Sequence, residues 1–314
     1  DVLMGVSLAP VYDGPVYAIR NLIYRTGVGN NDYSGSPFKF NSGYDKSGPM
    51  FLLHNTADAA LPGNSGLYIK APGSWELICA RNNVWSGTDY ALNNYNESQP
   101  VDLDYDDLYT TRTDEFVYWG HGSDRHMRDL STFQTLTGQE PHGLAVEPRF
   151  ADAAKGAYTL ASDSQLIDAG LPIPGINDDF AGTAPDIGAF EYVPAHGFTF
   201  SAQPPVQGIT PGGVATYTLS IQPLGSFSDT VALAAASPSP SLTLSLVPAA
   251  VEPPGQSRLT VIDGHTGWTM LPGLWYAMPV TATGGGYTRS LTVGLMIGGA
   301  RVHLPLILRA NSSR

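Results

Sequence analysis

The chain has 314 residues, including 35 glycines, 25 prolines and a single cysteine, and its net charge is −12. So much Gly and Pro excludes a mainly helical protein and is typical of many short strands joined by tight turns. The acidic balance argues against a nucleic-acid partner, because phosphate neutralisation requires a basic surface. No apolar run approaches the roughly 18 residues that a transmembrane segment needs, and the single cysteine, Cys79, excludes an intrachain disulfide.

A repeated pattern organises residues 14 to 110. Asn21, Asn55 and Asn82 each lie between two short apolar strand patterns, and Asp106 takes the place of Asn in a weaker fourth copy. The copies recur about every 24 to 34 residues, with Gly/Asn turns between them, which is typical of a solenoid. We expect the Asn side chains to form a ladder at a turn, where Asn tolerates left-handed backbone geometry. The expected apolar interior columns are Ile19, Leu53 and Ala80, and Ile23, Ala57, Val84 and Leu108.

Residues 129 to 138 predict a short helix, with Asp129 as N-cap and Gly138 just past its end. The most specific motifs of the chain follow, among them Val146-Glu147-Pro148-Arg149-Phe150 and Pro185-Asp186-Ile187-Gly188-Ala189-Phe190-Glu191. Together with the repeats, they resemble secreted right-handed parallel β-helix proteins, the pectate-lyase-like superfamily, over roughly residues 14 to 193. The resemblance implies that residues 1–196 are the C-terminal coils and closing segment of a parallel β-helix.

The chain changes character near Gly197. Residues 197–314 hold three acidic and five basic residues, whereas the first 196 residues hold 25 acidic and 11 basic ones. Strands with a period of two are predicted at 215–221 and 241–246, and further strands at 230–234, 258–262, 275–282 and 288–297. This pattern resembles bacterial immunoglobulin-like modules, so residues 197–300 are predicted to form an immunoglobulin-like β-sandwich. Residues 301–314 are predicted to form an apolar C-terminal strand and tail that needs a pairing partner.

The N-terminal end of the predicted solenoid has no cap. The repeat is already under way at Pro15, and the first residues lack the basic region of a signal peptide. An open solenoid end exposes unpaired backbone and apolar interior. We therefore expect either further coils upstream of Asp1, or self-assembly through this end and the C-terminal strand.

Two of the four lysines, Lys39 and Lys70, align in one column on successive coils. Two close ammonium groups lower each other's pKa, which would supply a base able to abstract the proton next to a uronate carboxylate. In polysaccharide lyases of the superfamily that the chain resembles, Lys and Arg do such work, which makes Arg81, or Arg20, a candidate carboxylate clamp. The alternative is a pair of solvated lysines neutralised by Asp45 or Glu76.

A second column consists of the residues just before the ladder positions, namely Arg20, His54, Arg81 and Tyr105. If these side chains face outward, they form a strip that binds acidic sugars or peptide carboxylates, with Arg acting bidentately and Tyr stacking. The alternative is that outward residues of a solenoid are polar simply because they contact water.

Two groups of acidic residues suggest calcium, because hard cations take several carboxylate oxygens. The first comprises Asp102, Asp104, Asp106 and Asp107, and the second Asp178, Asp179, Asp186 and Glu191. Neither group has the spacing of a defined calcium loop, and roles in turns and in closing the end of the solenoid explain the second group. Calcium is the only cofactor that the sequence suggests.

The sequence predicts a secreted or cell-surface protein in which a parallel β-helix precedes an immunoglobulin-like module. The leading hypothesis is a structural, fibre- or sheath-forming role combined with binding of a polysaccharide or cell-surface glycan. The alternatives are a polysaccharide lyase or glycoside hydrolase acting on acidic glycans, and an adhesin. The fold alone does not decide between an enzyme and a binding protein.

Overall fold

The computed structural model describes residues 5–8, 14–26, 36–40, 48–59, 61–69, 75–120, 125–178, 180–265 and 273–298. The chain forms two compact units, Asp1–Leu171 with Asp186–Tyr192, and Pro172–Pro185 with Val193–Arg314. Nearly all regular structure in the described residues is strand, so the all-β prediction is confirmed. The predicted C-terminal strand, residues 301–314, lies outside the described residues.

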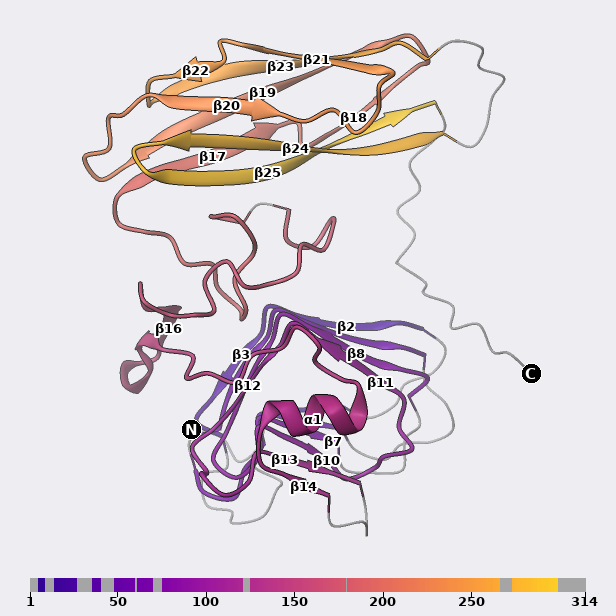
Figure 1. Ribbon diagram of the computed structural model, residues 1–314, viewed down its shortest axis with the longest axis vertical. Helices are drawn as coiled ribbons and strands as arrows, with labels where there is room; N and C mark the ends of the chain where they lie inside the picture. The colour runs from indigo at the N-terminus through magenta and orange to yellow at the C-terminus, as the bar shows by residue number, and fades with distance from the viewer. Residues whose placement is uncertain are drawn as a thin grey trace. The chain divides into compact units, whose positions relative to one another are not determined.

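In the first unit, successive strands belong in turn to three different sheets (Figure 1). We call each round of the chain through the three sheets a coil. The strands are β1 (Val6–Leu8), β2 (Val16–Ile19), β3 (Leu22–Tyr24), β4 (Phe38–Phe40), β5 (Met50–Leu53), β6 (Thr56–Asp58), β7 (Leu67–Ile69), β8 (Ile78–Arg81), β9 (Val84–Gly87), β10 (Leu92–Asn94), β11 (Val101–Asp104), β12 (Asp107–Thr110), β13 (Val117–Trp119) and β14 (His126–Met127). The sheet orders are β1-β4-β7-β10-β13-β14, β11-β8-β5-β2 and β12-β9-β6-β3. Neighbouring strands pair in parallel, except that β13 and β14 are antiparallel.

The interior of these coils consists of apolar columns, but their register differs from the predicted one. Ala18, Leu52, Ala80 and Leu103 form one column. Ile23, Ala57, Trp85 and Leu108 form another. The prediction that aligned Leu53 with Ala80, and Ala57 with Val84, is wrong by one residue, because Leu53 pairs with Arg81 and Val84 with Thr56. A slip of one residue exchanges the two faces of a strand, and the apolar residues decide which face lies inside.

A short helix and the chain that follows it cover the last coil. Helix α1 (Leu130–Thr137) has Asp129 as N-cap, whose side chain accepts from the backbone N–H of Thr132 at 2.7 Å, and it ends at Gly138 in left-handed geometry, as predicted. Phe133 is fully buried in the coil core. Beyond the helix, the backbone N–H of Glu140 donates to the carbonyl of Leu103 at 2.8 Å, and that of Leu108 donates to the carbonyl of Leu144 at 2.9 Å. The C-terminal edge of the coils is therefore hydrogen-bonded to this segment.

The rest of the first unit folds back onto the coils. A small antiparallel hairpin consists of β15 (Phe150–Asp152), the 3-10 turn η2 (Ala153–Lys155) and β16 (Ala157–Leu160). Leu160, Leu166 and Ile187 pack with Val84 in a second buried cluster. We call residues 164–171 and 186–192 the closing segment. Because Val84 belongs to β9, this cluster joins the closing segment to a coil strand.

The second unit contains two sheets that share one hydrophobic core. Its strands are β17 (Gly197–Gln203), β18 (Val206–Ile209), β19 (Val214–Leu224), β20 (Val231–Ala235), β21 (Leu242–Val247), β22 (Ala250–Val251), β23 (Gly255–Asp263), β24 (Leu274–Gly284) and β25 (Tyr287–Ile297). The sheet orders are β17-β19-β23-β21 and β18-β25-β24-β20-β22, with only the β18–β25 pair parallel among the described strands. Tyr217, Leu259 and Val293 are among its fully buried residues and come from both sheets.

Candidate functional site

A ladder of amide and carboxyl side chains runs from coil to coil through Asn21, Asn55, Asn83, Asp106 and Glu140. In each of its first three links, one side-chain oxygen accepts both the backbone N–H and the side-chain amide of the preceding coil. The distances are 3.1 and 2.8 Å from Asn21 to Asn55, 2.8 and 2.8 Å from Asn55 to Asn83, and 2.7 and 2.8 Å from Asn83 to Asp106. Glu140 Oε2 then accepts the backbone N–H of Asp106 at 3.2 Å. The third member is thus Asn83, not the predicted Asn82.

The left-handed backbone positions precede the ladder rather than coincide with it. Arg20, His54, Asn82 and Tyr105 have φ values of 54°, 52°, 59° and 60°. The prediction that the ladder residues themselves adopt left-handed geometry is therefore wrong, because the left-handed residue lies one position before each of the first four ladder residues. A single left-handed residue turns the chain between two strands of a coil, and Asn tolerates this conformation better than most side chains. Asn82 and Asn83 adjoin each other, so the sequence alone allows either residue to be assigned to the ladder.

The predicted outward strip of Arg20, His54, Arg81 and Tyr105 does not form. His54 is 1% exposed, because the closing segment lies against it. Its Nδ1 lies 3.2 Å from the carbonyl oxygen of Gly188, and its Nε2 lies 3.0 Å from Nδ2 of Asn82. Burial, with a contribution from the charge of Arg20, lowers the pKa of His54 to about 4. His54 therefore helps to hold the closing segment and is not available to a ligand.

The other members of the predicted strip have separate surroundings. Arg81 lies one position before the left-handed residue, in β8, and forms an ion pair of 2.7 Å with Asp102. Tyr105 stacks on His142 with ring centroids 4.7 Å apart. Arg20 is exposed. The strip was predicted from a strand register that is wrong by one residue at Arg81. The repeat pattern also gave no sign that the closing segment covers His54.

The predicted lysine column is changed by the strand register as well. Lys39 pairs with Tyr68, not with Lys70, which lies outside the described residues. Lys39 is 6% exposed, and its Nζ lies 6.0 Å from the ring centroid of Tyr68. Arg81 belongs to the β11-β8-β5-β2 sheet, whereas Lys39 belongs to the six-stranded sheet. Lys39 and Arg81 are thus on different sheets.

The carboxylates proposed for calcium are dispersed. Asp102 pairs with Arg81, and Asp104 lies 2.9 Å from Nδ1 of His142. Asp106 is a buried ladder member, Asp178 accepts the backbone N–H of Gly175 at 2.8 Å, and Asp186 accepts that of Asp168 at 2.8 Å. Asp179 lies outside the described residues. Within the described ranges, no three His, Cys, Asp or Glu side chains are placed to hold one metal ion.

Three buried carboxyl groups lie at the C-terminal end of the ladder instead. Asp106, Asp107 and Glu140 are each 0% exposed. Burial raises the pKa of Asp106 to about 7 and that of Asp107 to about 8. Burial, followed by the neighbouring charge of Asp106, also raises the pKa of Glu140 well above its ordinary value. Asp106 was predicted to take the place of Asn in the fourth copy of the repeat and, with Asp107, to belong to a calcium-binding group. Glu140 was not predicted, because it lies 34 residues beyond Asp106 and outside the repeat.

A cluster of aromatic side chains was not predicted. It comprises Tyr90, Tyr95, Tyr118 and His126, and we call it the tyrosine cluster. Tyr118 contacts the other three, with ring centroids 5.9 Å from Tyr90, 6.0 Å from Tyr95 and 5.0 Å from His126. Tyr95 is 38% exposed, and Tyr118 is half-buried. Tyr118 and His126 are register partners in β13 and β14, which the repeat pattern did not reach.

Polar groups hold the tyrosine cluster from one side. The hydroxyl of Tyr90 donates to Glu115 Oε2 and lies 3.1 Å from His126 Nδ1, which is itself 2.9 Å from Glu115 Oε2. Burial opposes the charge of Glu115, but hydrogen bonds from Tyr90 and His126 keep its pKa below the ordinary value. Arg112 lies over the Tyr90 ring at 5.5 Å and pairs with Asp89 and Asp114. The cluster therefore combines partly exposed rings with charged hydrogen-bonding groups.

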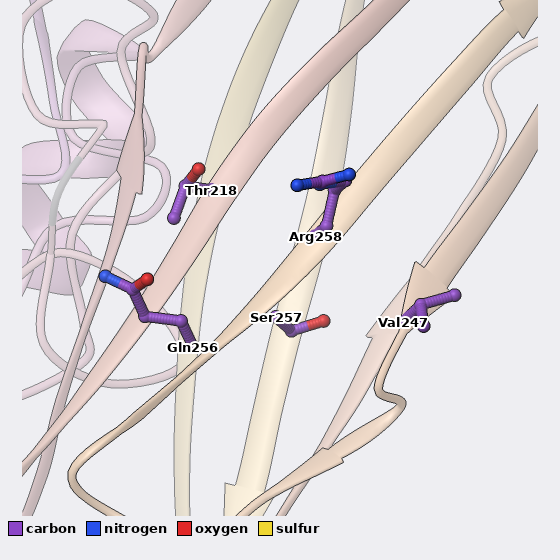
Figure 2. Close-up of a pocket in the computed structure, with 5 residues that line it drawn as sticks. All are labelled: Thr218, Val247, Gln256, Ser257 and Arg258. Carbon is purple, nitrogen blue, oxygen red and sulfur yellow. The ribbon is translucent and has the colours of Figure 1, made fainter.

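A shallow hollow of about 320 Å³ lies on the second unit. Figure 2 shows the residues that line it, namely Thr218, Val247, Gln256, Ser257 and Arg258. Thr218, Arg258 and Val247 are register partners on β19, β23 and β21. The hollow therefore crosses three neighbouring strands of one sheet.

Comparison with known proteins does not assign the chain to a family. No family model matches the sequence, and no curated protein matches it significantly. Solved structures with local similarity include S-layer protein SbsC domains 4 and 5 (13% identity, 32% of this chain, 53% of that chain, TM-score 0.24). A second is the VesB protease of Vibrio cholerae (10% identity, 31% of this chain, 31% of that chain, TM-score 0.25). A third is the E. coli chaperone DraB (15% identity, 32% of this chain, 55% of that chain, TM-score 0.24). These TM-scores are too low to indicate a shared fold, and the chain spans at most about half of each matched chain.

The described helices give no sign of a membrane-spanning segment, since none is both long and apolar enough to cross a bilayer.

Proposed function

We propose that this chain belongs to a secreted or cell-surface protein that binds glycan and has a structural rather than a catalytic role. Residues 1–196 are the C-terminal coils of a right-handed parallel β-helix, and residues 197–300 are an immunoglobulin-like β-sandwich. Three sheets of mainly parallel strands, a ladder that links successive coils, and two sheets around one core in the second unit support this reading. Such coils form a rigid scaffold on which surface side chains keep fixed spacings.

The tyrosine cluster is the observation that carries the binding proposal. Tyrosine offers a flat apolar ring for the C–H faces of a sugar and a hydroxyl that can hydrogen-bond. The rings of Tyr95 and Tyr118 are nearly parallel, with 21° between their planes, so together they extend one stacking surface. Glu115, His126 and Arg112 lie beside them as donors and acceptors for sugar hydroxyls. Binding sites of this type combine apolar walls with a few placed polar groups.

The test is glycan binding by matched tyrosine variants, measured by a glycan array and then by calorimetry with the best ligand. We expect Tyr118→Ala and Tyr95→Ala each to weaken binding about two- to tenfold, since one aromatic contact contributes about 0.5–1.5 kcal/mol. Tyr17→Ala is the control, because Tyr17 is similarly exposed at 37% and stacks on Phe51, but lies on a different sheet. Equal weakening by Tyr17→Ala, or no glycan bound by the wild type, would refute the proposal.

Assembly is the second part of the proposed role. At the N-terminal end, Val16, Ala18 and Ile23 are only partly buried against the core, and β2 and β3 are sheet edges among the described strands. At the other end, Glu140 and Leu144 already bind the last coil. We propose that a strand from a neighbouring molecule pairs with β2 or β3, which would give head-to-tail polymers. Light scattering over a wide concentration range tests this, and a monomer at every concentration would refute it.

A further inference from the structure

One face of the second unit carries almost no charge. The sheet β17-β19-β23-β21 turns alternate residues outward, and most of them are Ser, Thr or Gln, while the others include Val214, Val247, Ile262 and Arg258. Register pairing arranges them in rows across the strands. One row consists of Gln203, Thr218, Arg258 and Val247, a second of Thr216, Thr260 and Ser245, and a third of Ser201, Ser220 and Gln256.

Arg258 is the only charged residue among the outward-facing positions of these four described strands. It is exposed, and no carboxylate of the described residues lies within salt-bridge distance of it. Exposed sheet faces usually carry several charges of both signs. The Arg258 guanidinium is surrounded by hydroxyl and amide groups. It can therefore donate two hydrogen bonds to the carboxylate of a ligand.

The hollow described above is built around this guanidinium. Figure 2 shows Arg258 between Thr218 and Val247, with Gln256 further along the same strand. The Gln256 amide donates to Ser220 Oγ at 3.2 Å, which fixes one neighbour of the hollow, and the Ser257 hydroxyl is turned away to the carbonyl of Pro248 at 2.6 Å. Val247 is 69% exposed and supplies an apolar rim. The hollow thus offers one charge, neutral hydrogen-bonding groups and a small apolar surface.

We propose that this hollow binds a uronate carboxylate of an acidic polysaccharide, with the sugar chain lying along the row of Gln203, Thr218, Arg258 and Val247. The carboxylate accepts hydrogen bonds from the Arg258 guanidinium, and the hydroxyls of the sugar ring form hydrogen bonds with the flanking Thr and Gln side chains. Since strands lie about 4.8 Å apart, the row extends across roughly 14 Å and suits an extended chain of several sugars. The site lies in the second unit and does not depend on the tyrosine cluster.

Other anionic polymers fit this surface less well. Nucleic acid requires several phosphate contacts from a basic patch, whereas this face offers one Arg. An acidic peptide would present carboxylates in short succession to a single guanidinium. An acidic glycan presents hydroxyl groups beside each carboxylate, and the Ser, Thr and Gln side chains around Arg258 can exchange hydrogen bonds with them.

The experiment is affinity electrophoresis of the full chain in gels containing polygalacturonate, with dextran as the uncharged polymer. We expect polygalacturonate, but not dextran, to retard the wild type, and Arg258→Gln to lose about tenfold in apparent affinity. Arg258→Lys, which keeps the charge but not the bidentate geometry, should fall between them. The charge-matched control is Arg125→Gln, because Arg125 is also exposed but lies in the first unit.

Several outcomes would overturn the proposal. Absence of retardation of the wild type by polygalacturonate would do so, as would equal retardation of the wild type and Arg258→Gln. Equal losses in Arg258→Gln and Arg125→Gln would show a net-charge effect only. Equally tight binding of polyglutamate or duplex DNA would show that Arg258 is a general anion contact and not a sugar site. Thermal unfolding of Arg258→Gln should match the wild type, since the side chain is exposed.

Discussion

Asp106 accepts two hydrogen bonds from Asn83, one from its backbone N–H at 2.7 Å and one from its side-chain amide at 2.8 Å. Asn83 in turn accepts the same two bonds from Asn55. A ladder member is therefore both acceptor and donor, and removing its side chain from the middle takes hydrogen bonds from the coils on both sides. Buried groups without partners cost more than the net value of the bonds that they lose.

We expect Asn83→Ala to lower the free energy of unfolding of the first unit by about 2–4 kcal/mol, because it leaves the buried backbone N–H of Asn55 without its acceptor and removes one of the two hydrogen bonds that Asp106 accepts. Asn21→Ala should cost about 1 kcal/mol, because Asn21 is half-buried and has one ladder neighbour among the described residues. Urea titrations of the two variants provide the measurement. Equal costs for the two positions would show that the ladder does not act as a chain of linked bonds.

The buried carboxyl groups should make the first unit less stable as the pH rises. In the folded state the pKa of Asp106 is about 7 and that of Asp107 is about 8, whereas the ordinary value is 3.8. Between about pH 4 and pH 8 the folded state therefore binds more protons than the unfolded state. The contribution of these two groups to the free energy of unfolding is fully present below about pH 4 and is lost as the pH rises towards 8. Hydrogen exchange of residues 75–110 at pH 5 and pH 8 measures this, and we expect faster exchange by opening at pH 8 after correction for the intrinsic rate.

His54 acts in the opposite direction at lower pH. Its pKa falls from 6.5 in the unfolded chain to about 4 in the folded state, so its contribution is present above pH 6.5 and is lost as the pH falls towards 4. Glu140→Gln separates the two effects, because it removes one buried carboxyl and leaves His54 unchanged. The variant should flatten the slope between pH 5 and 8. An unchanged slope would show that Glu140 does not contribute to the proton binding of this cluster.

Gly188 should be sensitive to substitution, because it combines unusual backbone geometry with close packing. Its φ is 116°, and an added Cβ would lie 3.0 Å from Thr56 Oγ1 and 3.3 Å from Val84 Cγ2. We expect Gly188→Ala to loosen the closing segment by more than about 1 kcal/mol and to speed its limited proteolysis. Gly175→Ala is the control, since Gly175 also has positive φ, 82°, but nothing lies within 4 Å of the added carbon. Similar proteolysis of the two variants would contradict the packing argument.

Helix α1 provides a comparison between two positions on one element. Phe133 is fully buried, whereas Leu136 is 60% exposed. Phe133→Ala should lower the free energy of unfolding by about 3–5 kcal/mol through the cavity that it leaves, and Leu136→Ala by less than about 0.5 kcal/mol. Thermal and urea unfolding of both variants give the answer. A small effect of Phe133→Ala would mean that the helix does not seal the coil core.

The architecture was largely readable from the sequence, whereas most of the site was not. Repeat length and Asn spacing predicted stacked parallel strands, and the capping residues Asp129 and Gly138 predicted the helix with its ends. Six strands of the second unit lie where alternation predicted them, but β17, β18 and β22 were missed. The errors at Arg81 and Asn82 share one cause. Two adjacent Asn residues fit the ladder equally well, and only packing of the neighbouring apolar residues selects between them.

The misplaced site residues have a different cause. His54 is covered by Gly188, 134 positions further along the chain, and Asp106 by Glu140, 34 positions away. Local pattern carries no information about such contacts. The tyrosine cluster similarly arises from a strand pairing beyond the last recognisable repeat. Aligning the third strand of each coil, rather than the Asn-bearing turn, would have brought Asn93 and Tyr118 into one column.

The uniform links of the ladder have a consequence for how this protein can change length during evolution. A coil duplicated next to Asn21 would meet the same ladder donors and acceptors as the coil that it copies. The coils that carry His54 and Asn82 have an additional constraint, because these side chains bind Gly188 and Leu171 of the closing segment. Among the described coils, an added coil is therefore expected to disturb the fewest contacts with the closing segment when it lies on the Asn21 side.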